Sequence, residues 1–194
     1  MKKSTTDSRL ASVRDSLPAM KELYVDAAAH LGFPEDTVTA VCGCAALNML
    51  GFHTHLIAGS AKWLLMTDEE QGDAMLTGIK PVGYYGYEYH TTEALPLFVK
   101  GRMPEMHAWA VGVETEIVYD FTGPSQMKQF EELDNSHKWP LSRRLPSVIW
   151  GEYEELATRG WFYTEDTTAT EFLGKLIGLL SMTTINLALK GARP

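Results

Sequence analysis

Two residues with catalytic side chains, His107 and Asp120, stand on neighbouring segments that are predicted to be strands. The segments MHAWAV and EIVYDF are separated by a short turn, which is typical of a β-hairpin. If the strands pair symmetrically about the midpoint of Val113 and Glu114, His107 lies directly opposite Asp120 on one face of the sheet. A carboxylate there can accept the imidazole Nδ1–H, which fixes the tautomer and stabilises the imidazolium. The spacing therefore predicts the orienting pair of a catalytic triad.

Such a pair needs a nucleophile, and the only two thiols of the chain are Cys42 and Cys44. They lie in TVTAVCGCAALNMLG, which is predicted to form a helix capped near Thr37 or Thr39 and ended by Gly51. The amides and dipole of a helix start lower the pKa of a thiol, and a first-turn amide can donate to an oxyanion. A glycine before Cys44 favours a turn there, whereas a longer helix favours Cys42, so both stay candidate nucleophiles.

Aromatic residues are the candidates for a substrate cleft. Trp109 shares the face of His107 because side chains alternate along a strand. The tract YYGYEYH places Tyr85 and Tyr87 on one side if it is extended, and they could form an aromatic wall. The pattern is weak from residues 67 to 103, where TDEEQGD suggests a solvated turn. A long irregular segment of this kind is expected to border the cleft.

The order of these elements resembles the transglutaminase-like branch of the papain-like cysteine enzymes, including uncharacterised bacterial and phage members. The resemblance rests on a cysteine at a helix start, on GFHTHLIAGSAKW after it, and on HAWAVGVETEIVYDFT, where an H-x-W strand precedes a strand ending in D-x-T. It covers roughly residues 38 to 123. The matching positions are Cys42 or Cys44, Gly51, Gly59, His107, Trp109, Asp120 and Thr122.

The residues and the resemblance together predict a thiol-dependent acyl-transfer enzyme, as a cysteine protease or amidase with a Cys-His-Asp triad. The thiolate would attack a peptide, protein or small-amide carbonyl to form a thioester. His107 would carry the proton to the leaving amine, Asp120 would orient His107, and no cofactor is expected. The alternatives are a non-catalytic binding protein on the same fold, a transglutaminase or acyltransferase, and a metal hydrolase that uses His53, His55 and His107.

The expected fold class is α+β, with the nucleophile-bearing helix packed on an antiparallel sheet. One papain-like or transglutaminase-like domain is expected over residues 1–194. Helices are predicted over residues 7–17, ended by Pro18, and over residues 19–31. Further helices are predicted over residues 125–133 and in the apolar segment between Lys175 and Lys190.

Charge and cysteine content limit the partners and the compartment. Seventeen basic and twenty-five acidic residues give a net charge of −8, which disfavours nucleic acid and anionic membranes as partners. The longest apolar run is too short and too polar for an integral membrane segment. Two free thiols so close in sequence favour a reducing environment, so a cytoplasmic location is expected.

Overall fold

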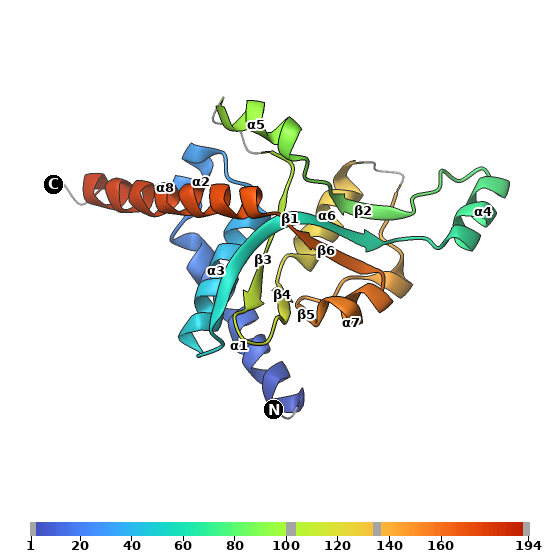
Figure 1. Ribbon diagram of the computed structural model, residues 1–194, viewed down its shortest axis with the longest axis horizontal. Coiled ribbons are helices and arrows are strands. Elements are labelled where there is room, and N and C mark those ends of the chain that lie inside the picture. Colours follow the sequence, from blue (N-terminus) through green and yellow to red (C-terminus); the bar gives the residue numbers. More distant parts are fainter. Residues whose placement is uncertain (1–2, 100–103, 134–136, 192–194) are drawn as a thin grey trace.

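The computed structural model describes residues 3–99, 104–133 and 137–191 (Figure 1). This part of the chain is of the α+β class, with helices and one curved antiparallel sheet. The helices are α1 (Lys3–Glu22), α2 (Val25–Leu31), α3 (Glu35–Met49), α4 (Asp68–Leu76), α5 (Thr91–Val99), α6 (Gly123–Leu133), α7 (Tyr153–Thr158) and α8 (Thr167–Gly191), with a 3-10 turn, η1, at Leu141–Arg143. The strands are β1 (Thr54–Leu64), β2 (Tyr84–Tyr87), β3 (His107–Gly112), β4 (Val118–Asp120), β5 (Ile149–Gly151) and β6 (Trp161–Glu165).

The long strand β1 organises the sheet. Its first half pairs with β3, from Thr54 opposite Gly112 to Gly59 opposite His107, and its second half pairs with β2. Strand β6 pairs with β1 across the junction of these halves. It must therefore lie along one edge of β1, while β2 and β3 both lie along the other edge. The start of β3 and the end of β2 therefore meet along one edge of β1. Strands β4 and β5 continue the sheet beyond β3.

The N-terminal helices differ from the prediction in their boundaries, since α1 covers residues 3–22 and α2 begins only at Val25 and not at residue 19. The helix predicted to end before Pro18 continues to Glu22, so α1 includes the proline. Interior proline weakens a helix because it lacks an N–H and crowds the preceding turn. Here Leu10, Val13 and Leu17 form a buried stripe against the core, and this packing carries the helix past the proline. The predicted end of the next helix is confirmed, since Gly32 follows α2 in the left-handed conformation.

The segment predicted to be a solvated turn, Asp68 to Glu70, forms the first turn of helix α4. Thr67 caps this helix through the amide of Glu70, and the Glu70 carboxylate accepts the amide of Thr67 in return. This reciprocal arrangement is a capping box, whose Thr-x-x-Glu pattern is visible in the sequence. In Figure 1, α4 projects at the right, away from the centre of the sheet.

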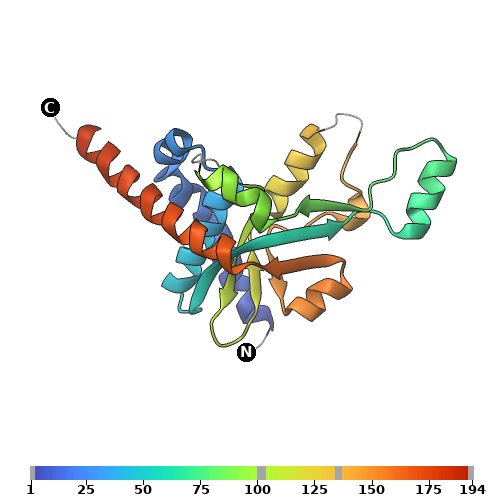
Figure 2. The ribbon, with the colours of Figure 1, turned by 45° about the horizontal axis from the view of Figure 1, so that its top comes forward.

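The predicted C-terminal helix is present and longer than expected. Leu173 and Leu180 of α8 are buried, whereas Leu179, Met182 and Ile185 are exposed. Figures 1 and 2 show the C-terminal part of α8 extending past the other elements. Among the helices of the described residues, none has the length and apolar content that a bilayer crossing requires.

Two glycines give a matched test of this packing. A Cβ on Gly59 of β1 would lie 2.1 Å from the carbonyl oxygen of Thr164, whereas a Cβ on Gly72 of α4 meets nothing within 4 Å. We expect Gly59→Ala to lower the free energy of unfolding by about 1–3 kcal/mol, because β6 must move. Gly72→Ala should leave it unchanged or raise it by about 0.5–1 kcal/mol. Urea unfolding of both variants checks this, and an unchanged Gly59→Ala would contradict the close pairing of β1 and β6.

Candidate functional site

The His107 and Asp120 side chains are hydrogen-bonded in the interior. Nε2 of His107 lies 3.0 Å from Oδ2 of Asp120, and both side chains are buried. The bond uses Nε2 and not Nδ1, the atom expected from the sequence. In the neutral imidazole the proton is then on Nε2, and Nδ1 carries the lone pair. Nδ1 is buried and has no hydrogen-bond partner among the described residues.

The register of the β3–β4 hairpin differs from the prediction by two residues. Ala110 pairs with Tyr119 and Val111 with Val118, so paired residue numbers sum to 229 and not to 227. The turn contains four residues and ends at Glu116, which has a left-handed φ of 53°. Because the slip is an even number, both side chains stay on the predicted face of the sheet. Asp120 lies diagonally from His107 and not directly opposite it.

The Asp120 carboxylate is satisfied by donors from three places in the chain. Besides His107, Oδ2 accepts from the hydroxyl of Tyr163 at 2.8 Å. Oδ1 accepts from the amide of Thr122 at 2.8 Å and from its hydroxyl at 2.7 Å. Burial raises the pKa of Asp120, but His107 and the hydrogen bonds from His107 and Thr122 outweigh it and hold the pKa below its usual 3.8. The carboxylate is therefore ionised at neutral pH.

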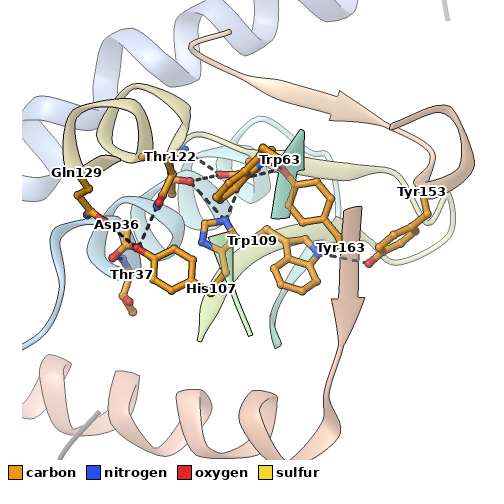
Figure 3. A network of polar contacts seen from close by, with 12 residues as sticks. Asp36, Thr37, Trp63, His107, Trp109, Thr122, Gln129, Tyr153 and Tyr163 are labelled. Carbon is orange, nitrogen blue, oxygen red and sulfur yellow. Dashed lines mark hydrogen bonds and ion pairs between the residues drawn. The ribbon is translucent and has the colours of Figure 1, made fainter. Parts of the chain in front are cut away.

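Aromatic rings enclose the imidazole of His107 (Figure 3). Tyr87 stacks on it with ring centroids 5.6 Å apart, Trp109 stacks at 5.9 Å, and Trp63 meets it edge-on at 5.2 Å. This shell removes the pair from water. The predicted substrate-binding role of Trp109 is not supported by its position. Its ring is fully buried, and its N–H donates to the hydroxyl of Tyr153.

Both candidate nucleophiles lie in the middle of α3 and not at its start, so this part of the prediction is wrong. The helix begins at Glu35, seven residues before Cys42. Pro34 precedes it as the N-cap residue, and the acidic side chains of Glu35 and Asp36 favour a first turn there because they interact with the helix dipole. Both thiols are buried in the core around α3, and Cys44 faces Thr54 of β1. Burial raises the pKa of Cys42 to about 11, although Lys21 opposes this, and burial also raises the pKa of Cys44. Neither thiol is prepared to ionise at neutral pH.

The sheet register shows how far Cys44 lies from the imidazole. Its Sγ is 3.5 Å from the hydroxyl of Thr54, which pairs with Gly112 at the far end of β3. Five residues of extended strand separate Gly112 from His107, or about 16 Å. Within the described chain, neither Cys42 nor Cys44 has a hydrogen bond to His107.

The first turn of α3 presents a carboxylate beside the His107 site. Asp36 is buried, and its Oδ1 accepts the amide of Thr37 at 2.8 Å. Its Oδ2 accepts from Nε2 of Gln126 and from the hydroxyl of Tyr87, each at 3.1 Å. Figure 3 shows Asp36 and Thr37 on one side of His107, opposite Trp109 and Tyr163. Asp36 thus occupies the helix start at which the resemblance expects the nucleophile.

Tyr85 and Tyr87 lie on the inner face of β2, as their spacing predicted. Tyr85 stacks on Trp63, and Tyr87 covers His107. The Tyr87 hydroxyl is shared between Asp36 and Oε1 of Gln129, 2.7 Å away. Burial raises the pKa of Tyr87, so the hydroxyl remains protonated and keeps donating. Both tyrosines also line a groove of about 470 Å³ between β2 and α6, so their predicted place at a ligand surface is compatible with the structure.

The histidines proposed for metal binding do not converge. His53 and His55 are exposed, and His55 pairs with Val111, four residues from His107 along β3. In the described part of the chain, no three His, Cys, Asp or Glu residues are placed to hold a metal ion.

Sequence reasoning missed three members of this network. Asp36 was not among the predicted site residues, because the predicted helix began only at Thr37 or Thr39. Tyr163 comes from β6, more than forty residues after Asp120, and Gln126 comes from α6. For Asp36, the pattern Pro-Glu-Asp-Thr was available as a signal of a helix N-terminus. For Tyr163 and Gln126 no local signal exists, because tertiary folding alone brings them to the site.

Comparison with models of protein families, with curated proteins and with solved structures found no match for this chain.

The ionised Asp120 makes a testable contribution to stability. Because its folded pKa is depressed, the contribution is present above the unfolded value near 3.8 and is lost as pH falls through the folded pKa. Asp120→Asn should lower the free energy of unfolding at pH 7 by about 3 kcal/mol. It should also reduce the loss of stability on acidification. Urea unfolding at pH 7 and at acidic pH measures both effects, with exposed Glu154→Gln as the control. Equal pH dependence in Asp120→Asn and wild type would contradict an ionised Asp120.

Proposed function

We propose that this protein is a non-catalytic binding protein that keeps the helix, strand and His–Asp arrangement of a cysteine enzyme without the thiol. The observation that carries the proposal is Asp36. It stands at the start of α3 beside the His107 site and is held by donors from α3, α6 and β2. A carboxylate with three donors is a stable hydrogen-bonded anchor and a poor nucleophile, because its lone pairs are already engaged.

The tyrosine ring that stacks on the imidazole of His107 supports the same function. Tyr87 lies on the ring of His107 and is hydrogen-bonded to both Asp36 and Gln129. Nδ1 is buried as well, so a substrate could reach it only if the side chains around the imidazole moved. In a binding protein the same contacts are useful, because they fix β2 against α3 and α6 and give its exposed side a defined shape.

Thiol labelling separates this proposal from the thiol enzyme predicted from the sequence. With iodoacetamide at neutral pH, we expect Cys42 and Cys44 of the folded protein to react at least tenfold more slowly than the same thiols in urea, because both are buried and protonated. Mass spectrometry assigns each site, and His107→Ala should not slow either reaction. Fast labelling of one cysteine that depends on His107 would overturn the proposal and support a cysteine protease or amidase.

A gain-of-function variant tests the position assigned to Asp36. In Asp36→Cys the new thiol lies at a helix N-terminus beside His107, so its pKa should fall. We expect it to react with iodoacetamide at least tenfold faster than Cys42, and His107→Ala in the same background should remove this difference. Thr37→Cys is the matched control, one residue along the same turn. Equal rates at positions 36 and 37, or no dependence on His107, would show that Asp36 does not stand at a nucleophile position.

A second candidate is a hydrolase in which His107 is the general base. Its support is the buried Nδ1, which has no hydrogen-bond partner among the described residues and which such a base would use. This candidate requires turnover of an amide or ester by wild-type protein. Fluorogenic peptide amides and p-nitrophenyl esters measure it, with His107→Gln as the control. Release in wild type, lost in folded His107→Gln, would favour the hydrolase; equal background release would leave the binding protein.

A further inference from the structure

Strand β2 has an edge that is not paired within the described residues. The amide of Leu65 donates to the carbonyl of Gly83, which fixes the hydrogen-bonding phase between β1 and the segment of β2. Because hydrogen-bonded pairs alternate in an antiparallel ladder, Tyr85 and Tyr87 direct their backbone groups toward β1. The N–H and C=O groups of Tyr84 and Gly86 therefore point outward. Such an edge is a template for another strand.

Two grooves flank this edge, one on each face of the sheet. The first, of about 470 Å³, lies along Tyr85 and Tyr87 and reaches Gln129 and Leu133 of α6. The second, of about 370 Å³, lies along Tyr84 and Lys62. Gly86 and Glu105 line both grooves. Each volume is within the range of ligand pockets, about 300–1,000 Å³. A strand paired with Gly86 would direct alternate side chains into the two grooves.

Among the described residues, carboxylates outnumber ammonium groups in the lining of both grooves. Glu105 and Glu132 line the first groove, and Lys128 lies 3.6 Å from Glu132 at an exposed position. Among the described residues, Glu88, Glu93 and Glu105 line the second groove together with Lys62 and His90, and Nε2 of His90 lies 3.8 Å from a carboxylate oxygen of Glu88. The ammonium of Lys62 lies over two aromatic rings, 5.2 Å from the ring centre of Tyr84 and 5.7 Å from that of Phe162. A ligand in these grooves therefore meets carboxylates on both faces.

From the edge that is unpaired within the described residues and from the carboxylates of both grooves, we propose that β2 binds an extended, basic peptide segment as an added antiparallel or parallel strand. This inference rests on the proposed binding function and names its ligand class. Backbone bonds to Tyr84 and Gly86 supply affinity, and neighbouring Lys or Arg side chains enter opposite grooves, where Glu105 serves both. An acidic ligand lacks the basic side chains that enter the grooves, and a polyproline ligand lacks the backbone N–H groups that pair with β2. Nucleic acid is excluded by the same carboxylates.

A short peptide probe tests backbone pairing and charge separately. The probe is fluorescein-labelled Thr-Val-Lys-Lys-Lys-Val-Thr, and binding to the full chain is followed by fluorescence anisotropy. We expect saturable binding that weakens at least tenfold when salt is raised from about 0.05 to about 0.5 M. The same peptide with three central glutamates should bind at least tenfold more weakly. A third peptide is the lysine peptide with N-methyl groups on its three central backbone amides. It keeps its charge but loses those three backbone N–H donors, so it should also bind at least tenfold more weakly.

Two protein variants locate the site. Glu93→Gln with Glu105→Gln removes one carboxylate of the second groove and the carboxylate common to both, and should weaken binding of the lysine peptide about fivefold or more. The control is Glu114→Gln, at the exposed hairpin tip at the far end of β3. It should leave affinity unchanged. Equal affinities of all three proteins would show that the peptide binds elsewhere and would overturn the inference.

The outcomes distinguish this inference from the proposed function. No saturable binding, or equal binding of the N-methylated peptide, overturns edge pairing by β2, and slow labelling of both thiols in the same preparation would leave the non-catalytic assignment intact. Cleavage of the lysine peptide during the titration, detected by mass spectrometry and lost in His107→Gln, overturns the non-catalytic assignment. Loss of affinity in the Glu93→Gln, Glu105→Gln protein would still support the peptide site in that case.

Discussion

The hydrogen bond between His107 and Asp120 constrains more of this structure than any other contact. An ionised carboxylate in the interior is costly unless donors surround it, and those of Asp120 come from β3, β6 and the residue that precedes α6. To bring Tyr163 to the same oxygen as His107, β6 must lie across β1 from β3. The curvature of the sheet and the placement of this single carboxylate are therefore linked.

A second buried carboxylate, Asp36, joins the remaining elements to this centre. It links the start of α3 to α6 through Gln126 and to β2 through Tyr87, whose ring lies on His107. The two acidic centres are thus connected by one aromatic stack. This arrangement fixes β2 on its inner side, and within the described residues its outer edge has no paired strand. The contacts that bury one face of the imidazole also hold the proposed peptide-binding strand in place.

Local patterns predicted several elements because their causes are local. The alternation in MHAWAV and EIVYDF predicted the face that His107 and Asp120 share. This held although the centre of the turn lies one residue later than assumed, since the resulting slip of two residues preserves the face. The end of α2 at Gly32 follows from the same kind of signal. The start of α3 was predicted near Thr37 or Thr39, whereas the helix begins at Glu35, directly after Pro34. The proline within α1 was overridden by burial of its apolar stripe.

The sequence by itself determined that the chain is α+β, that His107 and Asp120 share a sheet face, and that Tyr85 and Tyr87 lie together on one side of a strand. Each of these depends on a periodicity of two or on a turn between adjacent segments. Only the tertiary structure decided which residue stands beside His107. That place is filled from the first turn of α3 by Asp36 and from β2 by Tyr87, while Cys42 and Cys44 lie in the core. The distance between elements far apart in the chain depends on packing, and no local spacing encodes it.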